Sequence, residues 1–137
     1  MVAEQGDSGG ELKGVSILIL EDNPLIGYEI EDLFANAGAD VVLVDTLPDA
    51  LDALDHDPRL VVTDYLIEGS TSLPLIRQAH ARDIPVVLIT GYAIASDDVL
   101  TGYEPRIFTK PFNHHELLRH VIDTVRNGAS PTRPGAL

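Results

Sequence analysis

The chain contains no cysteine, few basic residues and no long hydrophobic run. The absence of cysteine from its 137 residues excludes disulfides, a thiol nucleophile and a cysteine-ligated zinc site. Only 9 Lys and Arg accompany 22 Asp and Glu, and the formal net charge of −13 argues against nucleic-acid binding, which needs a basic surface. The apolar runs have the length of strands and are far shorter than the roughly 20 residues of a membrane span. We therefore expect a protein that binds neither nucleic acid nor membrane.

The length and the hydrophobic content of 45% indicate one domain with a sizeable core. Residues 1–14 are polar and rich in glycine, without the hydrophobic stretch of a signal peptide, and we expect them to be disordered. The Pro-containing residues 128–137 are also expected to be disordered. The predicted domain therefore covers residues 15–127, and the predicted location is cytoplasmic.

Inside this domain, apolar segments of strand length alternate with amphipathic segments of helical spacing. The predicted strands are 15–20, 41–44, 60–64, 86–90 and 107–109, and the predicted helices are 24–37, 47–56, 72–81, 93–100 and 113–125. The strands are continuously apolar, which is typical of a parallel sheet covered by helices on both faces. Five β/α units with right-handed crossovers predict a doubly wound α/β sandwich of flavodoxin-like strand order 2-1-3-4-5.

Residues that handle charge or phosphate follow four of these strands. Glu21-Asp22, Asp64, Thr90-Gly91 and Lys110-Pro111 stand at successive strand ends. In a parallel sheet these ends share one edge, and ligands bind outside it. Three carboxylates, a hydroxyl and an ammonium suit one Mg²⁺ ion and one phosphoryl group, with Asp64 as both metal ligand and nucleophile. A single strand-ending Asp is usually a helix cap or turn residue, so the prediction depends on the four ends together.

These motifs carry a family resemblance. Over nearly all of residues 15–127 the chain resembles the receiver domain of bacterial two-component response regulators. In this comparison Glu21 and Asp22 match the acidic pair, Asp64 matches the phosphoacceptor and Thr90 matches the switch hydroxyl. Lys110-Pro111-Phe112 matches the lysine motif, whose Lys-Pro peptide is cis in the family.

The resemblance implies a phosphorylation-controlled switch rather than an enzyme. It implies Mg²⁺ bound by Glu21, Asp22, Asp64 and the backbone carbonyl of Leu66. The phosphoryl donor would be a histidine kinase or a histidine phosphotransfer protein. A downstream protein would bind the face formed by the fourth helix, the fifth strand and the fifth helix. We expect a stand-alone receiver without an output domain.

The acidic pair Glu21-Asp22 departs from the usual Asp-Asp of the family but keeps the charge, and the chain departs from the family pattern at two further positions. Ile107 occupies the place of the usual Tyr or Phe three residues before the lysine, and Leu66 follows Asp64 by two residues without the frequent Met-Pro nearby. Thr90-Gly91-Tyr92 partly resembles a subfamily of single-domain receivers whose fourth strand ends Phe-Ala-Thr-Gly-Tyr. We therefore hypothesise that Tyr92 replaces the missing aromatic switch; alternatively, Tyr92 is a packed loop residue.

Two other functions stay open at this point. A pseudo-receiver would be a constitutive interaction module, against which the intact Asp64, Thr90 and Lys110 argue. An Mg²⁺-dependent phosphohydrolase with an aspartyl intermediate normally needs a second acid two residues after its nucleophile, where this chain has Leu66. His115-Glu116 and His120 miss the HExxH spacing by one residue, and we expect both histidines to be exposed helix residues.

Overall fold

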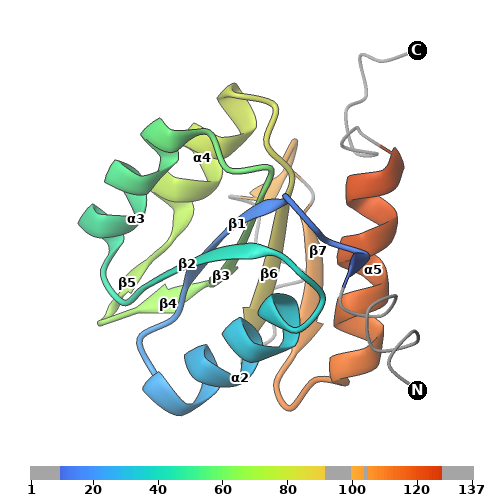
Figure 1. Cartoon of the computed structure of the whole chain (residues 1–137). Helices are drawn as coiled ribbons and strands as arrows, with labels where there is room; N and C mark the ends of the chain where they lie inside the picture. Colours follow the sequence, from blue (N-terminus) through green and yellow to red (C-terminus); the bar gives the residue numbers. More distant parts are fainter. Residues whose placement is uncertain (1–9, 92–99, 104, 128–137) are drawn as a thin grey trace.

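The computed structural model describes residues 10–91, 100–103 and 105–127, and Figure 1 shows their arrangement. Within this part of the chain, a parallel five-stranded sheet has the order β2-β1-β3-β6-β7. Its strands are β1 (Ser16–Leu20), β2 (Asp40–Val44), β3 (Leu60–Asp64), β6 (Val86–Thr90) and β7 (Arg106–Thr109). The predicted flavodoxin-like strand order is confirmed, and each strand begins within one residue of its predicted start.

Helices cover both faces of this sheet, as the continuously apolar strands predict. The helices are α2 (Pro24–Ala35), α3 (Leu47–Ala53), the 3₁₀ turn η1 (Leu54–His56), α4 (Leu73–Ala81) and α5 (His114–Asn127). Phe34 of α2 and Leu117 of α5 share one buried cluster with Ile17 and Ile19 of β1. The opposite face packs α3 and α4 onto the sheet in a second cluster, which includes Leu18. Successive residues of β1 therefore serve the two layers in turn.

Side-chain caps begin three of the helices. Asn23 Oδ1 accepts the backbone N–H groups of Leu25 and Ile26 at the start of α2. Thr46 Oγ1 accepts an N–H from the first turn of α3, and Asn113 Oδ1 accepts the N–H of Glu116 at the start of α5. Each cap satisfies a backbone donor that has no partner within its own helix. The predicted caps at Asn23 and Asn113 are confirmed.

A short hairpin follows β3 that the sequence patterns did not predict. The two-residue strands β4 (Leu66–Ile67) and β5 (Ser70–Thr71) pair antiparallel around Glu68 and Gly69. Both turn residues have positive φ values, 51° and 81°, as a tight hairpin of this kind requires. The strands are too short to show an alternating pattern, so Gly69 is the only local indication of the turn.

The structure corrects one predicted boundary and leaves two segments undescribed. Leu12 is fully buried in the core and its N–H donates to the carbonyl of Ala37, so residues 10–14 belong to the folded part instead of being disordered. Burial of its apolar side chain and the backbone hydrogen bonds of the segment together stabilise this ordered conformation. The predicted helix 93–100, except Leu100, and Tyr92 lie outside the described residues, as do residues 1–9 and 128–137. None of the helices in the described ranges has the length and apolar character required to cross a membrane.

Candidate functional site

Three carboxylates converge at the carboxyl edge of the sheet. Glu21 and Asp22 follow β1, Asp64 ends the neighbouring β3, and one oxygen of each lies within 4.8 Å of the others. The parallel register pairs Leu20 with Thr63, which brings the two strand ends together. Glu21 and Asp64 are 3% and 8% exposed, so their charges are largely removed from water. The fold thus gathers the acids that the sequence separates by more than forty positions.

Lys110 places its ammonium group between two of these carboxylates. Its Nζ donates a hydrogen bond of 2.7 Å to Asp64 Oδ2 and lies 3.0 Å from Glu21 Oε1. The backbone N–H of Lys110 donates to the carbonyl of Thr90, and the following peptide bond to Pro111 is cis. Burial alone would lower the pKa of Lys110, but its contacts with Asp64 and Glu21 outweigh burial and raise it. Lys110 is therefore a permanent cation beside Asp64.

The surroundings of Glu21 keep it less acidic than a free glutamate. Burial raises the pKa of Glu21, and the backbone N–H of Asn23, the Lys110 ammonium and their hydrogen bonds offset only part of this effect. Glu21 Oε1 is buried, and the Lys110 ammonium lies 3.0 Å from it. A second cation at this oxygen would relieve the cost of its ionised form.

Asp22 is held from the other side by the unexpected hairpin. Its Oδ2 accepts the backbone N–H of Glu68 at 3.0 Å, across 46 positions of sequence. The N–H of Leu66 donates to Asp64 Oδ1 at 3.3 Å. The hairpin therefore positions two of the three carboxylates. The sequence patterns did not indicate Glu68 as a site residue, because it contributes a backbone N–H, which every residue except proline has.

Thr90 lies at the end of the next strand. The register pairs Asp64 with Ile89, so Thr90 stands one position further along β6, with its side chain 1% exposed. A Cβ added to Gly91 would meet only the Lys110 Cβ, at 4.0 Å, so a larger residue would stand against the lysine. The predicted set Glu21, Asp22, Asp64, Thr90 and Lys110 thus shares one edge.

Two further predicted site residues, Leu66 and Ile107, lie in different surroundings. Leu66 is 38% exposed, and its peptide lies beside Asp64, but metal ligation by its carbonyl stays a prediction. Ile107 is half-buried against a small cluster that contains Tyr65, Ile76, Leu88 and Leu100. Tyr65 directly follows Asp64 and its ring is buried there, a placement that the sequence patterns did not indicate.

One histidine prediction is wrong. His115 is exposed as expected, whereas His120 is half-buried with its ring centroid 5.8 Å from that of Phe108. Burial and the charge of Arg106 lower the pKa of His120. The α5 helix turns this residue toward β7, because residues 117, 121 and 124 share the buried side of the helix with it.

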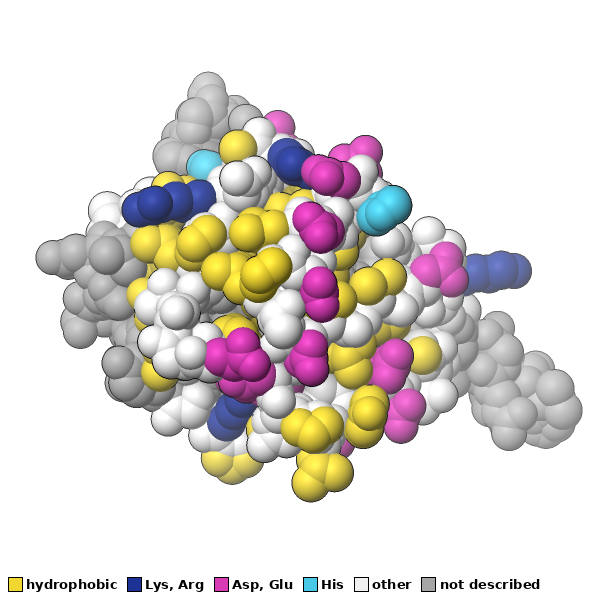
Figure 2. Space-filling model, turned by 90° about the vertical axis from the view of Figure 1, so that its left-hand side faces the viewer, with side chains coloured by type: hydrophobic (Ala, Val, Ile, Leu, Met, Phe, Trp, Pro, Cys, Tyr) yellow, Lys and Arg dark blue, Asp and Glu magenta, His cyan; other side chains and the backbone are white. Residues whose placement is uncertain are grey.

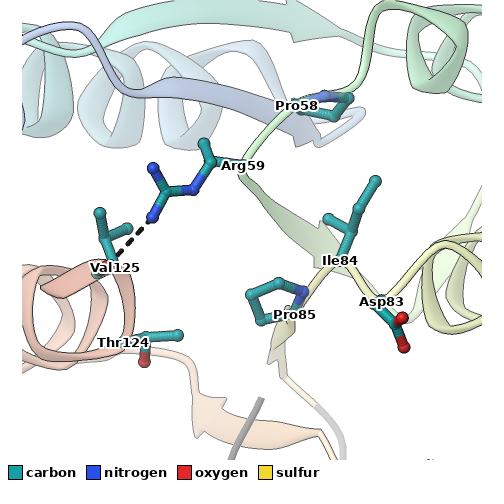
Figure 3. Close-up of a pocket in the computed structure, with 7 residues that line it drawn as sticks. All are labelled: Pro58, Arg59, Asp83, Ile84, Pro85, Thr124 and Val125. Atoms are coloured by element: carbon teal, nitrogen blue, oxygen red, sulfur yellow. Dashed lines mark hydrogen bonds between the residues drawn. The ribbon is translucent and has the colours of Figure 1, made fainter. Parts of the chain in front are cut away.

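A separate small cavity of about 130 Å³ lies at the opposite end of the sheet (Figure 3). Pro58 and Arg59 precede β3, Pro85 precedes β6, and Thr124 and Val125 belong to the last turns of α5. The Arg59 guanidinium donates to the carbonyl of Val125 at 3.0 Å, which satisfies a carbonyl at the helix end. This contact gives Arg59 a structural role, and the cavity is not part of the carboxylate site.

The residues at the carboxyl edge fit a hard divalent cation. Carboxylate oxygens are the ligands that Mg²⁺ prefers, and three of them converge here. The buried Glu21 Oε1 shares the Lys110 ammonium with Asp64, so it can also serve as a ligand for such an ion. The same edge offers a carboxylate, an ammonium and a hydroxyl, and groups of these kinds can serve phosphoryl transfer to a carboxylate.

Comparison with known proteins points to signalling proteins. No protein-family model matches the chain. Over 118 residues it is 30% identical to the phosphate regulon transcriptional regulatory protein PhoB of Klebsiella pneumoniae, covering 80% of this chain and 51% of that protein. The chain thus spans about half the length of this curated relative.

Solved structures agree with this comparison. A response regulator receiver protein from Sinorhizobium medicae is 25% identical, with a TM-score of 0.70 over 83% of this chain and 95% of that one. The receiver domain of a sensor histidine kinase from Pseudomonas aeruginosa has the same fold at 23% identity, with a TM-score of 0.68 over 80% of this chain and 95% of that one. That structure contains a magnesium ion coordinated in its active-site cleft.

Proposed function

The chain contains a receiver domain of the response-regulator family, and from this premise we propose that it accepts a phosphoryl group on Asp64 and thereby switches its interactions with other proteins. Receiver domains are regulatory modules of two-component signalling, and the relatives described above support that general role. The specific acceptor, donor and partner are our proposal. The observation that carries it is the Lys110 ammonium, 2.7 Å from Asp64 Oδ2, beside three converged carboxylates.

The proposed reaction is a transfer from a phosphorylated histidine. The bond between phosphorus and the imidazole nitrogen breaks, and an Asp64 carboxylate oxygen forms the new bond to phosphorus. The imidazole keeps the electron pair of the broken bond. Lys110 then balances charge on the phosphoryl oxygens, since its ammonium already lies at Asp64. Thr90 at the adjacent strand end would donate its hydroxyl to the same group.

Glu21, Asp22, Asp64 and the carbonyl of Leu66 would hold Mg²⁺ in this proposal. The ion supplies positive charge that offsets the carboxylates and the incoming phosphoryl group. Asp22 keeps its orientation through the Glu68 N–H, and Asp64 keeps its orientation through the Leu66 N–H and Lys110. The protein therefore holds two of the ligands in place before any ion or phosphoryl group arrives.

The proposed donor is a histidine kinase or a histidine phosphotransfer protein. Apolar side chains next to the carboxylate edge offer it a surface. Leu25 and Tyr28 on the first turns of α2 are 75% and 58% exposed, and Leu66 is 38% exposed. Such contacts would align the donor histidine with Asp64, because apolar burial supplies affinity while the charged groups supply direction.

The downstream partner would bind the face that includes Leu100, β7 and α5. Ile107 on β7 has neither an aromatic ring nor a hydroxyl group that could respond to a movement of Thr90. The hypothesis that Tyr92 is the switch residue therefore stands as a proposal. The expected cytoplasmic location and the role as a switch rather than an enzyme are also proposals.

If Tyr92 takes this role, amide exchange with and without beryllofluoride should change most across residues 91–103.

Acetyl phosphate with Mg²⁺ tests the central proposal. We expect intact-mass spectrometry to show one added phosphoryl group on the wild type and none on Asp64→Asn, with Asp40→Asn labelled like the wild type as a matched control. Equal labelling of wild type and Asp64→Asn would refute the acceptor. No labelling of any form would favour a pseudo-receiver, and turnover of a phosphomonoester that depends on Asp64 would favour a phosphohydrolase.

A further inference from the structure

The strand β2 leaves one edge of the sheet open within the described part of the chain. It pairs only with β1, through contacts such as the Asp40 N–H with the Val15 carbonyl and the Glu21 N–H with the Val44 carbonyl. Alternate residues of a strand direct their backbone groups to opposite sides. The N–H and C=O groups of the intervening Val41 and Leu43 therefore point away from the sheet. They form a template for one more strand.

Apolar surface flanks this edge on both faces of the sheet. On the face of α3, Val42 is 48% exposed, and a hollow of about 70 Å³ lies beside Val42 and Ala53. At the carboxyl end of β2, a larger hollow of about 460 Å³ is lined by Tyr28 of α2, by Leu43 and by Asp49 of α3. A strand added along β2 would pass both hollows, and its successive side chains would point to the two faces of the sheet in turn.

Three aspartates lie around the edge. Asp40 begins β2, Asp45 follows it, and Asp49 lies in the first turn of α3; all three are exposed. Asp45 and Asp49 also line the larger hollow. On the side of the molecule that carries α3, acidic side chains lie around a group of hydrophobic ones, and Lys and Arg are few (Figure 2). A partner that fits this surface must carry positive charge.

We propose that the open edge of β2 binds an extended segment of another protein in which apolar residues alternate with Lys or Arg, by addition of a strand to the sheet. The backbone groups of Val41 and Leu43 would pair with the segment, its apolar side chains would cover Val42 or Leu43, and its cations would face the aspartates. A second copy of this chain is a poor occupant, because both edges carry the same aspartates and each chain has a formal net charge of −13.

This surface also touches the carboxylate site, because Val44 accepts the backbone N–H of Glu21 and the larger hollow includes Glu21 and Asp22. The inference does not rest on phosphorylation, however. A failure of Asp64 to accept a phosphoryl group would leave the edge, its hollows and its charge unchanged. The two proposals can therefore be tested separately.

The test uses the full chain labelled with ¹⁵N and an acetylated, amidated peptide, Arg-Val-Lys-Ile-Arg-Val-Lys. A second peptide, in which proline replaces both valines, keeps every charge but lacks two of the N–H groups. We expect the first peptide to bind and to slow amide exchange at Val41 and Leu43 at least tenfold. We expect the proline peptide to bind at least tenfold more weakly. The variant Val42→Lys should also lose at least tenfold in affinity, whereas Asn127→Lys, with the same charge change on α5, should not.

Three outcomes would overturn the proposal. The first is equal affinity for both peptides, which would mean simple charge attraction. The second is binding that protects amides elsewhere but not Val41 and Leu43. The third is a protein mass in ultracentrifugation that doubles with concentration and reverts in Val42→Lys, which would make a second copy the occupant of this edge.

Discussion

Magnesium should stabilise this chain through Glu21, Asp22 and Asp64, and the size of the effect follows from the site. One oxygen of each carboxylate lies within 4.8 Å of the others, so two ionised groups repel by roughly 3 kcal/mol at an effective dielectric constant of about 20, before screening by solvent. Lys110 offsets part of this repulsion at Glu21 and Asp64 but makes no ion pair with Asp22 among the described contacts. A bound divalent ion removes the remainder and favours the folded state.

Mass action predicts how steeply the free energy of unfolding rises with the logarithm of the Mg²⁺ concentration, and this slope does not depend on the affinity of the site for Mg²⁺. Once Mg²⁺ exceeds its dissociation constant, each tenfold increase adds about 1.4 kcal/mol to the free energy of unfolding. For a domain of this size about 1 kcal/mol shifts Tm by roughly 4 °C, so we expect about 6 °C per decade of Mg²⁺. Differential scanning calorimetry at constant ionic strength measures this slope, with NaCl replacing MgCl₂ to separate ion binding from general screening.

The variant Asp22→Asn isolates the charge. An asparagine oxygen can still accept the Glu68 N–H that Asp22 Oδ2 accepts at 3.0 Å, so the hairpin contact is retained while one carboxylate is lost. We expect this variant to have a higher Tm than the wild type without Mg²⁺ and to lose most of the slope. Asp40→Asn, which removes an acid at the far end of β2, should keep the wild-type slope. Equal slopes in wild type and Asp22→Asn would refute the metal site.

Three further predictions concern the phosphoryl group and pH. Lys110→Ala should still be labelled at Asp64 but should lose most of the amide-exchange response to beryllofluoride, because the ammonium that links Asp64 to β7 is gone. Leu66→Asn combined with Tyr92→Glu should shorten the half-life of the phosphoryl group several-fold, as measured by intact mass over time, because polar side chains can orient an attacking water. Because burial lowers the pKa of His120 in the folded state, its contribution to stability is full above about pH 6.5 and is lost as pH falls through the lower folded value. The Tm of the wild type should therefore fall more between pH 7 and pH 5 than that of His120→Gln.

Matched variants control these measurements. Lys13→Ala removes an exposed lysine far along the chain from the site and should keep the full beryllofluoride response. An undiminished response in Lys110→Ala would contradict the proposed link between Asp64 and β7. An unchanged or longer half-life in the double variant would show that polar side chains at these two positions do not orient an attacking water. His115→Gln removes an exposed histidine and should show the pH dependence of the wild type. If the Tm of His120→Gln fell as much between pH 7 and pH 5 as that of the wild type, groups other than His120 would cause the loss of stability in acid.

Sequence patterns alone predicted the layers of the fold and the residues grouped at the carboxyl edge. Continuously apolar strands separated by amphipathic helices favour a parallel sheet, because helices on both sides bury both faces of each strand. Parallel strands then bring their carboxyl ends to one edge, so Glu21, Asp22, Asp64, Thr90 and Lys110 could be grouped from their positions alone. Local caps such as Asn23 were also readable, because they depend on residues only three positions apart.

The contacts among these groups could not be predicted from the sequence patterns. The Glu68 N–H on Asp22, the burial of Tyr65 and Leu12, and the half-buried His120 all depend on packing between distant segments. The raised pKa of Glu21 depends above all on how much water the folded chain excludes. Residue identity fixes which chemical groups a strand end can offer, but burial and backbone hydrogen bonds arise from three-dimensional packing, which has no local pattern in the sequence.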